Sequence, residues 1–249
     1  MLRTVTANRY VAPLREGGSL PALVEADDDG LYVVKLRGAG QGPKALVAEI
    51  VAGELARALD LPVPELVFVD LDPHLPDAEP DPEIQELLAA SAGINVGLDF
   101  LPRSLPYVAA SGVEPDPVLA ASVVWLDAFT ENVDRTPRNP NLLWWHEQLW
   151  LIDHGAALYR QHAGLDPASA NGRFAPVRSH VLLPAAASIL DADARLAPRV
   201  TDELLESILA LVPTEWLGDA TADGYVDYLR ARLAAPRAWV EEAEDARGA

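Results

Sequence analysis

The segment FTENVDRTPRNPNLLWWHEQLWLIDHGAAL, residues 129–158, contains two aspartates in similar surroundings. Asp134 opens a turn rich in proline and asparagine, and Asp153 ends an apolar run shortly before a glycine. Asn139 follows the first aspartate by five residues, and the runs LLWW and QLWLID indicate the two strands of a hairpin. Because prolines interrupt the turn, it cannot be a continuous helix, and we expect Asp134 and Asn139 on a loop.

Carboxylate and amide groups in this order fit a site for a metal ion and a phosphate. An aspartate can accept the proton of an attacking hydroxyl, and Mg²⁺ prefers carboxylate and amide oxygens as ligands. Asp153, at the end of a hairpin strand and before Gly155, is well placed as a metal ligand. The alternative is an Asx-rich surface turn without chemistry, and this segment alone does not distinguish the two.

A second alternative is a metal hydrolase that uses histidine ligands. The spacing of the histidines matches no established zinc motif, so this hypothesis is the weaker one. The histidines that it would use are His146, His154, His162 and His180.

The bulk properties limit the class of protein. A chain of 249 residues, half of them hydrophobic, can bury a substantial core. It contains no cysteine, which excludes disulfides and Cys-ligated zinc. The N-terminus lacks the apolar core of a signal peptide, and no run approaches the roughly 20 apolar residues that cross a bilayer. We expect a soluble cytoplasmic protein.

The charge is strongly acidic, with 19 basic against 38 acidic residues and a formal net charge of −19. Binding to a phosphate backbone or an anionic membrane relies on clustered Lys and Arg, and the sequence has no such cluster. We therefore expect neither a nucleic acid nor a membrane as partner.

The pattern along the chain predicts an α+β fold. Apolar runs joined by Gly- and Asp-rich turns indicate an antiparallel meander of strands, followed by a helix rich in helix formers. The predicted strands are 10–14, 22–27, 31–36, 66–71 and 94–102, and the predicted helices of this half are 44–60 and 83–91. Beyond residue 104 helices dominate. We predict one at 116–133, one at 201–212 that starts with the capping residue Thr201, and a last one or two within 222–246.

A Pro- and Gly-marked link near residues 97–106 separates the two kinds of structure. We therefore predict two lobes with a cleft between them, a β-rich N-lobe over residues 1–103 and a helical C-lobe over residues 104–249.

Two glycine-rich stretches are candidates for phosphate contacts. REGGS, residues 15–19, lies between two predicted strands, where Gly17, Gly18 and Ser19 can bring main-chain N–H groups to a phosphate; an ordinary hairpin turn is the alternative. GAGQGPK, residues 38–44, lacks the spacing and the trailing Lys-Ser/Thr of a Walker loop, and we interpret it as a connection.

Lys35 is a lone cation in the apolar strand YVVKL, where a lysine must reach water or an anion. The following helix offers Glu49 and Glu54 as partners. Glu54 lies among the large apolar residues of that helix and Glu49 on the opposite, Ala/Gly-lined side, and the residues alone do not decide between them.

The serial order of these groups is that of a kinase-like phosphotransferase: a Gly turn, a strand Lys, a helix Glu, a break, an Asp with an Asn five residues later, and an Asp before Gly. The sequence resembles HipA-like kinases, in their compact bacterial branch without the extra N-terminal domain. The motifs that carry the resemblance are GGSLPALVEA, LYVVKLRG, AEIVAGELARALDLPVPE, GLDFLP, NVDRTPRNPNLLW and LWLIDHGAAL.

The resemblance implies a two-lobed protein-kinase-like fold and an ATP- and Mg²⁺-dependent transfer of phosphate, with a Ser or Thr hydroxyl of a protein as acceptor. It assigns Lys35 to the nucleotide phosphates, Glu49 to holding that lysine, and Asp134 to the role of catalytic base. It further assigns Asn139 and Asp153 to Mg²⁺, and it assigns the adenine contacts to Leu98, Asp99, Phe100 and Leu101.

The sequence departs from related kinases at two positions, with Thr136 where a histidine is common and His154 where protein kinases carry phenylalanine. These departures leave open a pseudokinase that binds nucleotide or a partner without turnover. A small-molecule kinase of the aminoglycoside-phosphotransferase kind is a second alternative, because the same groups in the same order would serve it.

Overall fold

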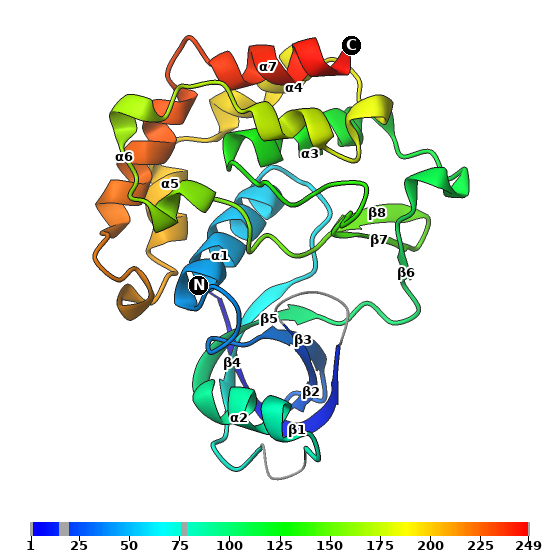
Figure 1. The fold of residues 1–249 in the computed structure, drawn as a ribbon, viewed down its shortest axis with the longest axis vertical. Helices are drawn as coiled ribbons and strands as arrows, with labels where there is room; N and C mark the ends of the chain where they lie inside the picture. The colour runs from blue at the N-terminus through cyan, green and yellow to red at the C-terminus, as the bar shows by residue number, and fades with distance from the viewer. Residues whose placement is uncertain (1, 15–19, 76–78, 249) are drawn as a thin grey trace.

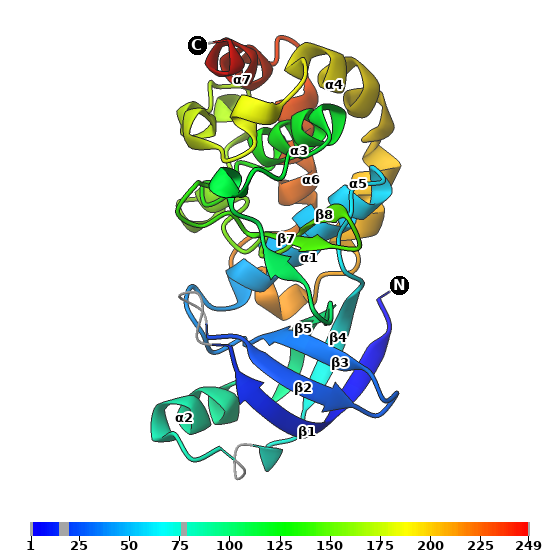
Figure 2. The ribbon, with the colours of Figure 1, turned by 90° about the vertical axis from the view of Figure 1, so that its right-hand side faces the viewer.

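The computed structural model describes residues 2–14, 20–75 and 79–248. Gly17, Gly18 and Ser19 lie outside these residues, so their phosphate contacts stay a prediction. Figure 1 shows a small barrel at one end of the molecule and a helical region at the other, and Figure 2 shows the same division from the side.

The N-terminal strands form a closed barrel in the order β1-β2-β3-β5-β4. The predicted antiparallel meander is present, and β5 pairs antiparallel with both β3 and β4. The start of β1 also pairs in parallel with β4, and register shifts along β1 allow the strand to bend between its two neighbours. The strands are β1 (Thr4–Pro13), β2 (Ala22–Ala26), β3 (Leu31–Lys35), β4 (Leu66–Leu71) and β5 (Gly93–Asp99).

Small and β-branched side chains fill the barrel, and the helix α2 (Pro82–Ala90) adds Ile84 and Leu88 to the same apolar cluster. The interior is tight around Gly97 of β5. A Cβ atom at this position would lie 2.5 Å from a methyl carbon of Val69 and 3.2 Å from one of Val67. Glycine is therefore required here for close packing across the barrel.

The region beyond residue 104 is mainly helical, as expected, and the hairpin predicted from the two apolar runs is present. It consists of β7 (Leu142–Trp145) and β8 (Gln148–Leu151), and the two-residue β6 (Leu105–Pro106) pairs with β7. The α-helices of this region are α3 (Pro117–Phe129), α4 (Ile189–Leu196), α5 (Asp202–Leu209), α6 (Ala222–Leu233) and α7 (Ala238–Arg247).

Several boundaries differ from the prediction for identifiable reasons. Helix α3 starts after its capping residue Asp116 and ends at Phe129, because Glu131 adopts a left-handed conformation with φ of 54°. The predicted run 222–246 is two helices, separated where Pro236 follows Ala235. Helix α4 and the short 3₁₀ helices were not predicted, and those between 159 and 185 are η3 (Tyr159–His162), η4 (Pro167–Ser169), η5 (Ala175–Ser179) and η6 (Leu183–Ala185).

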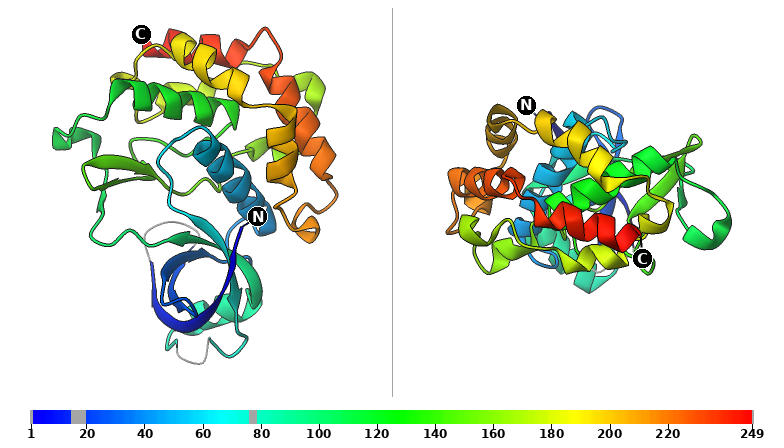
Figure 3. Two further views of the ribbon diagram at one scale, coloured as in Figure 1. Left: turned by 180° about the vertical axis from the view of Figure 1, so that it is seen from behind. Right: turned by 90° about the horizontal axis from the view of Figure 1, so that it is seen from above.

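Helix α1 (Pro43–Ala58) runs between the barrel and the C-terminal helices (Figures 1 and 3). Its apolar residues belong to the same core as those of α3, α5, α6 and α7, in which Trp125 stacks on Phe129 and meets Trp239 edge to face. The largest apolar core therefore does not end at residue 103. The division into lobes 1–103 and 104–249 stays a prediction.

Within the part of the chain that the structure describes, no helix is long and apolar enough to cross a membrane.

The barrel packing yields a stability prediction. We expect Gly97→Ala to lower the free energy of unfolding by about 1–3 kcal/mol, because the added methyl group overlaps Val69 and forces the barrel to shift. Urea unfolding measures the change. Gly172→Ala is the control, since a Cβ there has no neighbour closer than 3.5 Å. Equal stability of both variants would show that the barrel interior is not tightly packed.

Candidate active site

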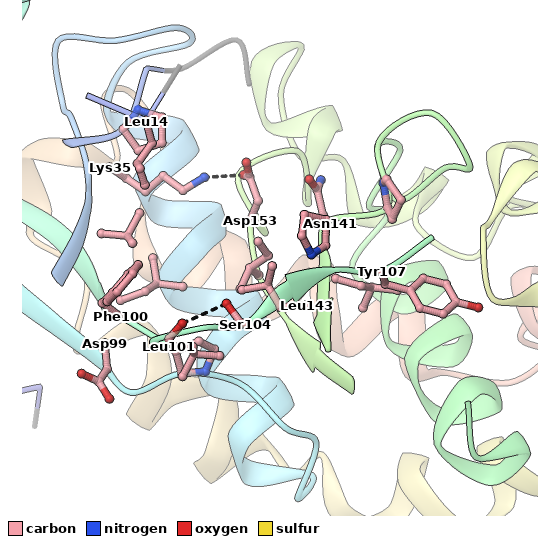
Figure 4. Close-up of a pocket in the computed structure, with 18 of the residues that line it drawn as sticks. Leu14, Lys35, Asp99, Phe100, Leu101, Ser104, Tyr107, Asn141, Leu143 and Asp153 are labelled. Atoms are coloured by element: carbon pink, nitrogen blue, oxygen red, sulfur yellow. Dashed lines mark hydrogen bonds and ion pairs between the residues drawn. The ribbon is translucent and has the colours of Figure 1, made fainter. Parts of the chain in front are cut away.

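A cleft of about 830 Å³ opens between the barrel and the helical region (Figure 4). Lys35, Asn139 and Asp153 all line it, and so do the four residues predicted to contact adenine: Leu98, Asp99, Phe100 and Leu101. Its apolar walls come from both sides and include Val33, Leu143 and Ile152. The fold thus brings together residues that are more than a hundred positions apart in the sequence.

Lys35 and Asp153 face each other across this cleft. Lys35 is the last residue of β3, its side chain is 10% exposed, and its Nζ lies 2.6 Å from Asp153 Oδ1. Asp153 follows β8 in a left-handed conformation with φ of 54°. Burial alone would raise the pKa of the Asp153 carboxyl, but the ammonium group of Lys35 holds this pKa below its ordinary value. Asp153 is therefore ionised and available as an oxygen ligand.

Glu49 does not make the expected ion pair with Lys35. Both residues are described by the structure, and the Lys35 nitrogen is not within the 4.0 Å of a salt bridge from a Glu49 carboxylate oxygen. Lys35 pairs with Asp153 instead. Glu49 is buried, and its Oε2 accepts a 2.9 Å hydrogen bond from the main-chain N–H of His154. The glutamate is thus committed to the backbone next to Asp153. Burial raises the pKa of Glu49, and Lys35, acting only from a distance, offsets part of this rise.

The other helix glutamate, Glu54, pairs with Arg57 of the same helix. Glu49 is therefore the α1 glutamate that lies beside Asp153, and it holds the segment after β8 rather than the lysine.

Asp134 is not among the residues that line the cleft, but two amides of lining residues hold it. Asn139 Nδ2 donates to Asp134 Oδ2 at 2.6 Å, and Asn141 Nδ2 lies 3.4 Å from the same oxygen. The main-chain N–H of Asp134 donates to Asn132 Oδ1 at 3.1 Å. Among the described residues, Asp134 Oδ1 has no hydrogen-bond partner, so one carboxylate oxygen remains free to accept a proton.

The residue after Asp134, Arg135, was not predicted as part of the site. Arg135 is buried, and its guanidinium pairs with Asp127 of α3 and donates to the main-chain carbonyls of Asn141 and Ile152. It therefore joins the loop of Asp134 to the strand that ends at Asp153. The sequence signal that could have indicated this ion pair is Asp127, a single charged residue in an apolar helix, just as Lys35 is a single charged residue in an apolar strand.

The histidines do not form a metal centre. His180 Nε2 lies 2.8 Å from Asp127 Oδ2, and His154 Nδ1 lies 3.3 Å from a guanidinium nitrogen of Arg135. Burial, together with Arg135, lowers the pKa of His154 to about 3, so this ring is neutral. In the described part of the chain no three His, Asp or Glu side chains gather as a metal site, and the hydrolase alternative has no support.

The residues that line the cleft fit a nucleotide and a hard divalent cation. Carboxylate and amide oxygens of Asp153 and Asn139 are the ligand types that Mg²⁺ takes, and Lys35 supplies a point charge for phosphate. The volume lies in the range of small-molecule sites. Along residues 98–101, the N–H groups of Asp99 and Phe100 bond to Glu65 and Leu31, which fixes the segment to the barrel.

Comparison with known proteins identifies a family and two structures of similar fold. A family model described as HipA-like kinase matches residues 8–235. The fold is similar to that of a Helicobacter pylori proinflammatory kinase, CtkA, with a TM-score of 0.58 and 13% identity over 99% of this chain and 98% of that chain.

It is also similar to a Golgi casein kinase solved with Mn and ADP bound, with a TM-score of 0.54 and 12% identity over 98% of this chain and 74% of that chain. At such identities the likeness concerns the fold, and it confirms the predicted two-lobed α+β architecture. No curated protein matches the sequence.

The burial of Glu49 yields a pH prediction. Burial raises the pKa of Glu49 from 4.5, the value for the unfolded chain, to about 7 in the folded protein. The protonated carboxyl therefore contributes fully to stability at a pH below its unfolded pKa, and this contribution is lost as the pH rises through its folded pKa. Glutamine can still accept the His154 N–H but cannot ionise. We therefore compare the free energy of unfolding of Glu49→Gln with that of the unmodified protein. We expect the difference to shift in favour of the variant by about 2 kcal/mol from about pH 5 to about pH 8.

Chemical unfolding at the two pH values measures this gain. Glu54→Gln, on the same helix, is the control and should show no comparable rise. A Glu49→Gln curve parallel to that of the unmodified protein would mean that Glu49 ionises as it does in water.

Proposed function

The chain belongs to the HipA-like kinase family, and we propose that it transfers the γ-phosphoryl group of ATP, with Mg²⁺, to a Ser or Thr hydroxyl of a protein. The observation that carries the proposal is the convergence of Lys35, Asn139, Asp153 and residues 98–101 on one cleft, with Asp134 hydrogen-bonded to Asn139. That the chain is a kinase follows from the family; its cofactors and its acceptor are the proposed parts.

The adenine base would lie between the apolar walls of the cleft. Val33 lines the cleft from the barrel, and Leu143 and Ile152 line it from the hairpin. Leu98, Asp99, Phe100 and Leu101, at the end of β5 and just beyond it, would contact the edge of the base through main-chain groups other than the N–H of Asp99 and of Phe100, which already bond to Glu65 and Leu31. Gly17, Gly18 and Ser19, which lie outside the described residues, are predicted from the sequence to approach the phosphates.

Lys35 would bind the phosphates as a point charge, released from its pairing with Asp153 to the extent that the phosphates compete for it. Asn139 and Asp153 would hold Mg²⁺, which would supply positive charge to offset the negative charge that develops on the phosphate oxygens. Glu49 would keep Asp153 in place, because it accepts the N–H of the next residue, His154. Its role is thus to position a ligand.

Asp134 would orient the acceptor hydroxyl and take its proton. Oδ2 is engaged by Asn139, which leaves Oδ1 for the hydroxyl. General acid–base groups placed in this way contribute typically 10²- to 10⁴-fold to the rate. One structural neighbour is a casein kinase solved with Mn and ADP bound, and this is in line with a protein acceptor and a divalent cation.

A test of the acceptor is incubation of the protein and a cell lysate with Mg·ATP, followed by a mass-spectrometric search for new phosphate. We expect phosphoserine or phosphothreonine on protein. Phosphate on a small molecule alone would favour the aminoglycoside-phosphotransferase kind of activity, and no transfer at all would favour a pseudokinase.

The nucleotide site yields a binding prediction. A ligand that binds only the folded state stabilises it by about 2.7 kcal/mol at a hundred times its Kd. We therefore expect Mg·ATP to raise the melting temperature, and ATP with EDTA to raise it less, since Asn139 and Asp153 would then lack the cation. Absence of any shift with ATP and Mg²⁺ would contradict both the kinase and the nucleotide-binding pseudokinase.

The two aspartates should separate by role. Asp153→Asn removes a negative charge from a cation site, so both the metal-dependent nucleotide affinity and the rate of transfer should fall. Asp134→Asn should leave Mg·ATP affinity within a few-fold while kcat falls by roughly 10²- to 10⁴-fold. Calorimetric titration beside a transfer assay measures both. Transfer at the unmodified rate by Asp134→Asn would remove Asp134 from the mechanism.

A further inference from the structure

Asn141 is a polar residue of the cleft that has no role in the proposed mechanism so far. Its main-chain oxygen accepts a 3.1 Å hydrogen bond from the N–H of Ile152, which extends the β7–β8 ladder by one step. Asn141 and Ile152 are thus neighbours on the hairpin, and both line the cleft. Figure 4 shows the side chains of Asn141 and Asp153 among those that line the cleft.

The backbone at Asn141 is fixed independently of any ligand. Its carbonyl also accepts a hydrogen bond from the buried guanidinium of Arg135. The residue has φ of 49°, in the left-handed region that asparagine tolerates better than most residues. Pro140 precedes it and restricts the chain between the two asparagines. The side chain therefore starts from a rigid position, which is what a ligand of a cation requires.

The hydrogen bonds also decide which end of each amide faces Asp134. An ionised carboxylate only accepts, so an amide that contacts it must present its NH₂ group. Asn139 and Asn141 both direct Nδ2 at Asp134 Oδ2, at 2.6 and 3.4 Å. The Oδ1 atom of each side chain is left as an acceptor, and neither has a donor among the described residues.

We propose that Asn141 supplies a second amide oxygen, beside that of Asn139, to the divalent cation that Asp153 holds. The inference rests on the proposed function and extends its set of ligands. Three oxygens would then come from the chain, and only that of Asp153 carries charge. A cation bound in this way keeps positive charge for the phosphates, and neutral amide oxygens are ligands that hard cations accept.

The test is calorimetric titration with ADP in Mg²⁺ and in EDTA, from which the ratio of the two Kd values gives the metal-dependent gain in affinity. Asn141→Gly keeps the left-handed backbone and removes the amide, and we expect it to reduce the gain by about tenfold or more, as Asn139→Ala should. Asn141→Asp keeps an oxygen but loses the NH₂ group, and we expect its gain to stay within about threefold of the unmodified protein.

Arg138→Ala is the control from the same loop, because Arg138 is exposed and does not line the cleft. Its gain should equal that of the unmodified protein. Melting curves in EDTA show whether each variant is folded. If Asn141→Gly is not folded, the result for Asn141→Asp alone decides the test.

An unchanged gain in folded Asn141→Gly would overturn the inference. So would an Asn141→Asp variant whose gain falls as far as that of Asn139→Ala, because the amide would then act through its NH₂ group on Asp134. The unmodified protein separates this failure from a failure of the proposed function: if it gains no affinity from Mg²⁺, the proposed function itself is wrong.

Discussion

The buried guanidinium of Arg135 is the interaction on which the geometry of the cleft depends. Removing a charge from water costs several kcal/mol, and this is offset only where its hydrogen bonds are made. Asp127 of α3 takes the charge, and the carbonyls of Asn141 and Ile152 take further donors. Burial would raise the pKa of Asp127, but Arg135 and His180 hold it well below its ordinary value, so the pair stays ionised. One side chain thereby fixes the core helix, the loop and the end of the hairpin relative to one another.

Helix α1 is fixed to the same assembly by other means. Lys44 donates to the carbonyl of Gln161, and Gln161 donates back to the carbonyl of Lys44. Ala48 and Ala52 of α1 pack on Ala157, so small residues allow the helix to approach the segment after Asp153 closely. Together with the hydrogen bond from His154 to Glu49, these contacts hold α1 without a direct ion pair to Lys35. The position of α1 thus depends more on its contacts with residues 154–161 than on β3.

The sequence predicted the structure well where local pattern and chemistry agree, and less well where segments far apart in the chain contact one another. The meander, α1, the hairpin and the set of residues around Lys35, Asn139 and Asp153 were all predictable, because alternation, capping and motif order are local signals. Closure of the barrel was not predictable, because β1 pairs in parallel with β4, and no local turn sequence indicates such a pairing. Nor was Arg135, whose partners come from three separate elements. The Lys35–Glu49 pair was expected by analogy, and the geometry gives Lys35 to Asp153 instead.

The charges of the cleft give a physical reason for a metal ion. Among its described lining residues the charged ones are Lys35, Asp99 and Asp153, one cation against two carboxylates, in a chain with a formal net charge of −19. A nucleotide triphosphate is itself strongly anionic, and repulsion between like charges grows where water is excluded. Lys35 alone cannot offset both its neighbour Asp153 and the phosphates. Under the proposed function, a divalent cation would reverse the sign of the interaction with Asp153, so that this carboxylate would anchor the phosphates through the cation instead of repelling them, and Lys35 would be left to bind them.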